Sequence, residues 1–192
     1  QIFPLKNFLF LFIKSKKEID SQYIENINDI KKDLNKLENI ESTFAIVDAP
    51  ILLLNDKKIS DLAKLKIENI NNTKTDLKLI LNEFSDSPIF KDQIINFEKN
   101  ISSIIIYIKK DFEFEKIKSE RKIKINDNLI NKEYKYQKKK NNFKKKILID
   151  EIRNIINNQN NTYEYYLGGI DMIVSDTINF VENDIIIFSF AV

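Results

Sequence analysis

The fold is read most directly from Phe8-Leu-Phe-Leu-Phe-Ile13, a dense apolar run that ends at Lys14. Its length and composition predict a buried strand. Apolar residues then recur at steps of three and four through residues 15–37, which places them on one face of a helix. Residues 42–47 predict a second strand. The chain therefore begins with a β-α-β unit, whose helix is long enough to return the chain for pairing.

A loop follows this unit. Pro50 lacks a backbone donor and favours an extended conformation at Ala49. The loop is therefore expected to begin at Asp48-Ala-Pro-Ile51, and the sequence stays only weakly periodic as far as residue 72.

A short helix and a hairpin are expected next. Residues 75–84 carry an apolar stripe, with Thr75 as the expected cap and Ser85-Asp-Ser-Pro88 as the end of the helix. Residues 94–97 and 102–108 are two apolar runs around a polar turn, which predicts a pair of hairpin strands.

Residues 111–158 form a long, highly charged segment. Its last part carries a stripe of isoleucines at helical spacing, whereas residues 116–146 have few apolar anchors. We expect a helical arm that bends near Asn126-Asp-Asn128. The segment carries a lysine-rich stretch with interleaved aromatic residues, which indicates either a solvated helix or a surface that binds nucleic acid or anionic lipid.

The second unit ends the chain. Residues 162–167 predict a strand, and the only two glycines, Gly168 and Gly169, predict a tight turn that needs a positive φ. A helix is expected over residues 170–183. Two β-α-β units joined in this way predict a ferredoxin-like α+β fold with a long helical insertion. We divide the chain into residues 1–110, the arm 111–160, the strand and turn 161–169, and the helix 170–192.

Composition excludes several function classes. The 192 residues carry a net charge of +2 and contain no Cys and no His. A disulfide scaffold, a Cys/His zinc site, a thiol nucleophile and a His-based triad are therefore absent from this chain. The scarcity of glycine argues against a β-sandwich or a barrel. Lys and Asn are abundant throughout, so their local runs carry little weight.

The last eight residues, Ile-Ile-Ile-Phe-Ser-Phe-Ala-Val192, are uncharged and apolar. Two interpretations stay open. The run is either the first two turns of a transmembrane helix, which needs about 20 apolar residues, or a final buried β-strand.

Four segments, taken in order, resemble the MMPL-like branch of the RND-superfamily exporters. They are Val47-Asp-Ala-Pro-Ile-Leu52, Ser87-Pro-Ile-Phe-Lys91, Ile149-Asp-Glu-Ile-Arg153 and Leu167-Gly-Gly-Ile-Asp-Met-Ile-Val-Ser-Asp176. In that family the last pattern marks the end of the first large extracytoplasmic domain. A strand and a Gly-Gly turn lead there into a helix and then into the second transmembrane helix.

The resemblance implies a porter domain on the periplasmic side of a proton-driven inner-membrane transporter. It implies a hydrophobic or amphiphilic, lipid-like cargo and a homo-oligomeric parent protein. It implies no catalytic residue, no cofactor, no metal and no nucleic-acid partner. The candidate structural or coupling residues are Gly168, Gly169, Asp176, Asp184, Asp48, Pro50 and Pro88.

The same residues allow other interpretations. Asp176 and Asp184 lie eight residues apart on one predicted helix, and serve either to couple domain motion to the membrane or simply to solvate the helix. The acidic residues Asp48, Asp56, Asp111, Glu113 and Glu115 lack the spacing of a calcium loop, so we expect structural or solvent-facing roles for them. An alternative function is a soluble helical adaptor that binds its partner through residues 111–158.

Overall fold

The computed structural model describes residues 7–52, 68–159 and 161–191. Along the chain its elements are β1 (Phe8–Lys14), α1 (Ser21–Leu34), β2 (Ile40–Ala45), the 3-10 turn η1 (Ile46–Asp48), α3 (Leu77–Asp86), β3 (Ile101–Ile108), α4 (Phe112–Ile123), α5 (Asn128–Asn157), β4 (Glu164–Gly168) and α6 (Ile170–Ala191). The mixed α+β class predicted from the sequence is confirmed.

The four strands form one antiparallel sheet in the order β2-β3-β1-β4. β1 lies in its interior because it pairs with both β3 and β4: Leu11 lies opposite Ile104 on one side and opposite Leu167 on the other. β2 pairs with β3, with a register shift between Ile40 and Ser42. The helix α1 therefore connects β1 to a strand that is not its direct neighbour, and β3 lies between them.

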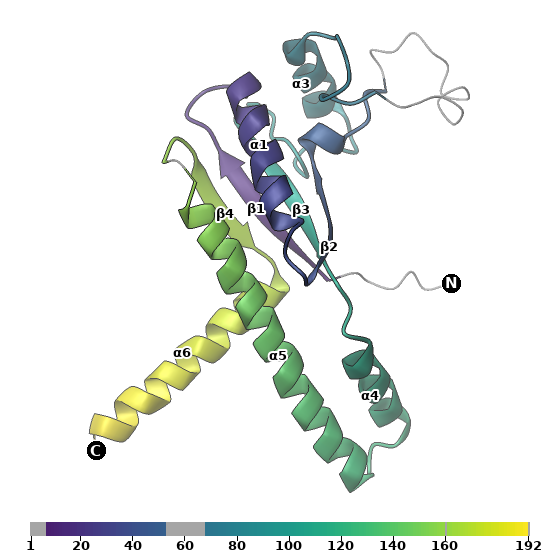
Figure 1. Cartoon of the computed structure of the whole chain (residues 1–192), viewed down its shortest axis with the longest axis vertical. Coiled ribbons are helices and arrows are strands. Elements are labelled where there is room, and N and C mark those ends of the chain that lie inside the picture. The colour runs from purple at the N-terminus through teal and green to yellow at the C-terminus, as the bar shows by residue number, and fades with distance from the viewer. Residues whose placement is uncertain (1–6, 53–67, 160, 192) are drawn as a thin grey trace.

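α1 and α5 cover one face of the sheet (Figure 1). Alternate residues of β1 point toward this face, and Leu9, Leu11 and Ile13 are fully buried. They form the core together with the apolar faces of α1 and α5, in which Ile27 and Ile152 have no exposed surface. This alternation is the period of two that a strand imposes on its side chains.

The opposite face of the sheet keeps aromatic side chains partly exposed. Phe8, Phe10 and Phe12 follow one another along β1, and their rings contact edge-to-face and then stacked, with centroids 5.2 and 5.5 Å apart. Phe8 is 41% exposed and Phe12 36%. Tyr166 of β4 extends this face and is also exposed. An apolar sheet face of this kind is normally covered by another layer.

Tyr23 of α1 joins the helix layer to two strands. Its hydroxyl donates to the Ile13 backbone oxygen at 2.6 Å and accepts from the Ser102 backbone N–H at 3.1 Å. A further hydrogen bond of 2.9 Å links it to the Ser102 hydroxyl. Burial raises the pKa of Tyr23 far above its ordinary value. The hydroxyl is thus a satisfied polar group inside the core.

Several predicted boundaries are wrong in detail. The second strand ends at Ala45, because residues 46–48 turn into η1, where the Asp48 side chain accepts from the Ala45 N–H at 2.7 Å. The cap of α3 is Asp76, one residue after Thr75, and its carboxylate accepts from the Lys78 N–H. The last strand begins at Glu164.

One predicted strand and one alternative strand interpretation are wrong. Ile95 makes only isolated bridges, to Lys91 and to Ser102, because the chain turns tightly at Asp92, where φ is 60°. The last eight residues continue the helix α6 as far as Ala191, and Ile185, Ile187 and Phe188 are more than half exposed. The interpretation of this run as a buried β-strand is therefore wrong. Most of the weakly periodic loop, including Asp56, lies outside the described residues.

Candidate functional site

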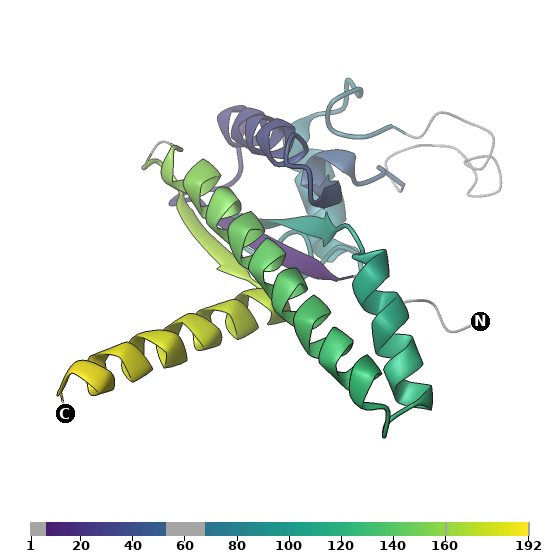
Figure 2. The same cartoon turned by 60° about the horizontal axis from the view of Figure 1, so that its bottom comes forward.

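The candidate site lies where α6 leaves the sheet and crosses α5. α6 begins at the end of β4, beside the middle of α5, and from there the two helices diverge, as both views show (Figures 1 and 2). The arm predicted from the sequence is a helical hairpin formed by α4 and α5, and its turn at residues 124–127 is close to the predicted bend. The hairpin turn and the far end of α6 project on the same side of the sheet (Figure 2).

Gly169 makes the turn from β4 into α6. Its φ is 136°, in the region that only glycine adopts without strain. A Cβ at this position would lie 2.9 Å from Leu9 Cδ2 and 3.2 Å from the Phe8 backbone oxygen. Gly168 is different: it is the last strand residue, and a Cβ there would meet only Phe12, at 3.9 Å. Of the two glycines, Gly169 is therefore the one that the geometry requires.

Two ion pairs hold the first turns of α6 against α5. Lys145 Nζ lies 2.6 Å from Asp171 Oδ1, and both side chains are only 19% exposed. Arg153 Nη2 lies 2.9 and 2.8 Å from the two carboxylate oxygens of Asp176. Asp176 is thus fixed in an ion pair, whereas Asp184, about 12 Å further along the helix, is exposed. The two predicted coupling residues do not share one environment.

A cleft of about 430 Å³ opens between α6 and the first half of α5. Its volume falls within the range of small-molecule sites. The residues that line it come only from these two helices: Lys135, Lys138, Lys139, Asn142, Phe143, Lys145, Lys146, Asp171, Val174, Ser175 and Ile178.

The cleft is strongly cationic. Lys145 is paired with Asp171, but Lys135, Lys138, Lys139 and Lys146 have no acidic partner within the described residues. The surrounding segment 111–146 carries thirteen Lys or Arg and six Asp or Glu, a net charge of +7, although the whole chain carries only +2. The rest of the chain is therefore net acidic, and positive charge is concentrated on the arm.

Ser175 is a buried polar side chain in the cleft wall. It is 8% exposed, and its hydroxyl has no hydrogen-bond partner among the residues that the structure describes. Most buried hydroxyls in proteins have a partner. Other serine and threonine hydroxyls on α6 do have one, since Thr177 and Ser189 each donate to the backbone oxygen four residues earlier. Ser175 therefore offers an unsatisfied group to whatever enters the cleft.

The base of the arm is fixed by Asp111, which caps α4 and accepts from the Phe114 N–H at 3.1 Å. Its carboxylate also accepts from Lys144 Nζ of α5 at 2.7 Å. This hydrogen bond from the Lys144 ammonium lowers the pKa of Asp111. Glu113 and Lys140 form a second, longer pair between the two helices. The predicted structural role of Asp111 and Glu113 is consistent with these contacts.

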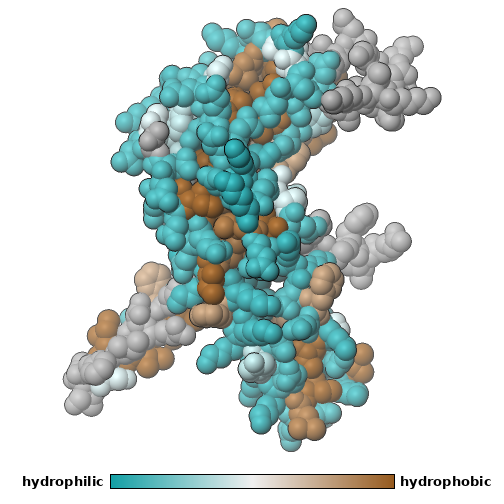
Figure 3. Space-filling model, in the orientation of Figure 1, coloured by the Kyte–Doolittle hydropathy of each residue, from teal (hydrophilic) through white to brown (hydrophobic). Residues whose placement is uncertain are grey.

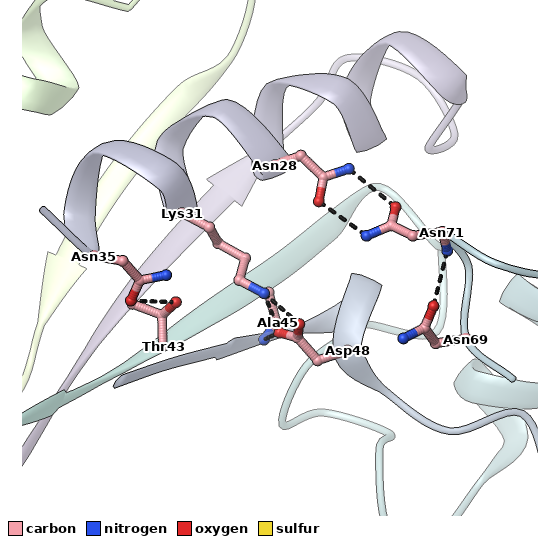
Figure 4. Close-up of polar contacts among 8 residues, drawn as sticks. All are labelled: Asn28, Lys31, Asn35, Thr43, Ala45, Asp48, Asn69 and Asn71. Carbon is pink, nitrogen blue, oxygen red and sulfur yellow. Dashed lines mark hydrogen bonds and ion pairs between the residues drawn. The ribbon is translucent and has the colours of Figure 1, made fainter. Parts of the chain in front are cut away.

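The remaining candidates, Asp48, Pro50 and Pro88, lie after β2 and after α3, and Figure 4 shows the contacts of Asp48. Asp48 accepts from Lys31 of α1 with both carboxylate oxygens and also from the Ala45 N–H. It therefore ties the end of β2 to α1. Pro50 follows as a half-buried loop residue, and Pro88 is exposed just after α3. These three residues do not meet Gly169 or Asp176 at the α5–α6 junction.

The lysines of the cleft and the pairing of Lys145 with Asp171 were missed by the sequence analysis. The lysine-rich run was noted, but in a lysine-rich chain its composition alone could not select a face. The helical spacing of Lys135, Lys138, Lys139, Asn142 and Lys146 was the available signal, because these positions share one side of a helix.

No protein-family model matches this chain, and no curated protein matches its sequence. Within residues 7–52, 68–159 and 161–191, no helix has both the length and the apolar character that a membrane crossing requires. The same residues contain no group of three or more acidic side chains that could hold a metal ion.

Proposed function

We propose that this chain is an extracytoplasmic domain of an RND/MMPL-like membrane transporter that moves hydrophobic or amphiphilic, lipid-like cargo. In this proposal the parent protein is a homo-oligomer integral to the inner membrane, and the domain lies on its periplasmic side. The observation that carries the proposal is the exposed apolar surface of α6. α6 leaves the sheet as a 22-residue helix with exposed apolar side chains along its length, among them Ile173, Val181, Ile185 and Phe188.

The surface of the molecule supports a membrane-facing orientation. Apolar residues gather on α6 and on the α4–α5 hairpin, which project on one side (Figure 3). Ile123, Ile125 and Leu129 at the hairpin turn are each at least two-thirds exposed. Monomeric soluble proteins rarely expose large apolar patches, and such patches mark contacts with proteins or membranes.

The sheet topology supports the ferredoxin-like porter fold that forms part of the proposal. The order β2-β3-β1-β4 with antiparallel pairing is the arrangement expected of two interleaved β-α-β units. In this assignment α1 and the second half of α5 are the two sheet-covering helices, and α4 with the first half of α5 is an insertion. The exposed aromatic face of β1 would then pack against another part of the parent protein.

The junction of α5 and α6 supplies a coupling element for a transport cycle. Gly169 fixes the angle at which α6 leaves the sheet, and the pairs Lys145–Asp171 and Arg153–Asp176 tie its first turns to α5. A movement of the membrane-directed end of α6 would therefore be passed to α5 and to the sheet. Asp184, exposed on the same helix, would lie nearer to the membrane interface.

Cysteine labelling in cells tests the proposal, and the chain suits it because it contains no native cysteine. Ser119, exposed on α4, is replaced by Cys in the protein in its natural host. A membrane-impermeant maleimide should label S119C in intact cells with a permeabilised outer barrier, and the protein should stay in the membrane fraction after alkaline extraction. Labelling only after lysis of the inner membrane, or release by alkali, would contradict the proposal. A cytosolic cysteine protein serves as the control.

The adaptor alternative retains one favourable observation. The exposed apolar turn of the hairpin and the net charge of +7 on residues 111–146 would suit an acidic protein partner. A soluble, cytosolic protein in the labelling experiment would favour this alternative. Its other expectation, that the last residues form an edge strand, is wrong because those residues continue α6.

A further inference from the structure

The cleft between α5 and α6 combines three features that together select a ligand. The α5 wall carries the four lysines without acidic partners, and the α6 wall carries Val174, Ile178 and the buried Ser175. Phe143 adds an aromatic ring on the lysine-bearing side. An anion would satisfy the lysines and the hydroxyl, and an apolar chain would cover the valine and the isoleucine.

We propose that this cleft binds a single anionic amphiphile, with its head group at Lys135, Lys138, Lys139 and Ser175 and its chain along Val174 and Ile178. If the amphiphile is the transported cargo, the cargo is anionic and the cleft is the site that receives it. That identification of the ligand as cargo rests on the proposed function. As a statement about binding, the proposal rests only on the cleft.

Charge complementarity decides the head group. Lysine ammonium groups bind phosphate and carboxylate as point charges. Lys135, Lys138 and Lys139 are exposed along this wall, and of the lysines that line the cleft only Lys145 has an acidic partner among the described residues, Asp171. The volume of about 430 Å³ suits one chain and one head group rather than a folded partner.

Other ligand classes fit less well. Binding of single-stranded nucleic acid uses rows of aromatic side chains for stacking, and Phe143 is the only aromatic residue that lines this cleft in the described part of the chain. A divalent metal would need acidic ligands, and the one carboxylate in the lining, Asp171, is already paired.

The test is calorimetric titration of the full chain with dodecyl phosphate below its micelle concentration. Dodecyl maltoside has the same chain without the charge, and inorganic phosphate has the charge without the chain. Each is expected to bind at least about tenfold more weakly than dodecyl phosphate, because each lacks half of the recognition. Equal binding of dodecyl phosphate and dodecyl maltoside would overturn the proposal.

Matched variants locate the site. K138Q/K139Q removes two cleft lysines and should weaken dodecyl phosphate binding by about tenfold. K122Q/K124Q removes the same charge from the exposed hairpin turn, away from the cleft, and should change binding by less than about twofold. S175A should weaken dodecyl phosphate binding, while Val174 and Ile178 still contact the alkyl chain of the ligand. If both lysine pairs weaken binding equally, the attraction is general to the arm and the cleft site is rejected.

The source of the anion is tested with phosphatidylglycerol and phosphatidylcholine vesicles. Binding to the anionic vesicles that K138Q/K139Q abolishes, without binding of monomeric dodecyl phosphate, would overturn the single-amphiphile site in favour of a bilayer surface. A glutamate-rich peptide that binds as tightly as dodecyl phosphate would overturn it in favour of a protein partner.

The two proposals fail separately. Dodecyl phosphate binding by a chain that labels as cytosolic would keep the cleft site and reject the transporter. Periplasmic labelling of S119C without any binding would keep the transporter and reject the cleft site.

Discussion

Lys145 of α5 and Asp171 of α6 form an ion pair of 2.6 Å at the point where the two helices diverge. The pair closes the base of the cationic cleft and, with Arg153 and Asp176, determines how α6 begins. Both partners are about four-fifths buried, so solvent screens this pair less than the other pairs on the arm.

The first prediction concerns this pair. A double-mutant cycle with K145Q and D171N should give a coupling free energy of about 1 kcal/mol, measured by urea unfolding. The control cycle, K118Q with E115Q on α4, joins two side chains that are each more than 40% exposed. It should give less than about 0.5 kcal/mol. Equal coupling free energies in the two cycles would show that the Lys145–Asp171 pair stabilises the fold no more than an exposed surface pair does.

The second prediction concerns the turn into α6. G169A should lower the free energy of unfolding by about 1–3 kcal/mol, because the positive φ is strained for alanine and its Cβ would meet Leu9 and the Phe8 backbone oxygen. G168A is the matched control, since its Cβ meets only ordinary contacts. Chemical denaturation measures both. A G169A protein as stable as G168A would contradict the assigned geometry.

The third prediction concerns the core hydroxyl of Tyr23. Y23F should lower the free energy of unfolding by about 1–3 kcal/mol, because it leaves the Ser102 N–H without its buried acceptor. Y165F removes a half-buried hydroxyl whose one hydrogen bond among the described residues goes to the Asn26 side chain, at 3.2 Å, and it should cost less than about 1 kcal/mol. Thermal and urea unfolding give the comparison. A larger loss of unfolding free energy in Y165F than in Y23F would contradict the assigned role of the Tyr23 hydroxyl.

The fourth prediction is a pH dependence at Asp111. Lys144 lowers the folded-state pKa of Asp111 below the ordinary value of 3.8. The stabilisation is therefore present above pH 3.8 and is lost as the pH falls through the lowered pKa. D111N keeps a side chain suited to the helix cap but removes the charge, and it should be less stable than the wild type at pH 7 by less than about 1 kcal/mol.

The difference between D111N and the wild type should vanish in acid, below the folded pKa of Asp111. NMR titration of the Asp111 carboxyl carbon measures that pKa directly. A pKa at or above 3.8, or a stability difference that persists in strong acid, would exclude the Lys144 interaction as the cause.

The sequence predicts the elements that depend on local pattern. The apolar run in β1, the isoleucine stripe of α5, the hairpin bend and the Gly169 turn all follow from residue periodicity or backbone restrictions, and the structure contains each of them. The strand expected at residues 94–97 fails because the tight turn at Asp92 outweighs the β propensity of its isoleucines.

The cleft could not be predicted in the same way. Its two walls lie about 35 residues apart in sequence, and the angle at which α6 leaves the sheet brings them together. Lys138 and Lys139 are unpaired because the fold brings no described acidic side chain close to them, and the sequence does not show this. Sequence spacing indicates which lysines share a face of α5, but not which helix that face meets.

The most direct test of the account is the membrane depth of α6. A nitroxide is attached to Cys introduced at Ser189 on α6, or at Ser119 on α4 as control, and power-saturation EPR is recorded with the protein bound to phosphatidylglycerol vesicles. Both positions are exposed in the structure. The account predicts that the Ser189 label is accessible to oxygen and shielded from a water-soluble nickel complex, with the reverse at Ser119. Equal access of the nickel complex to both labels would contradict it.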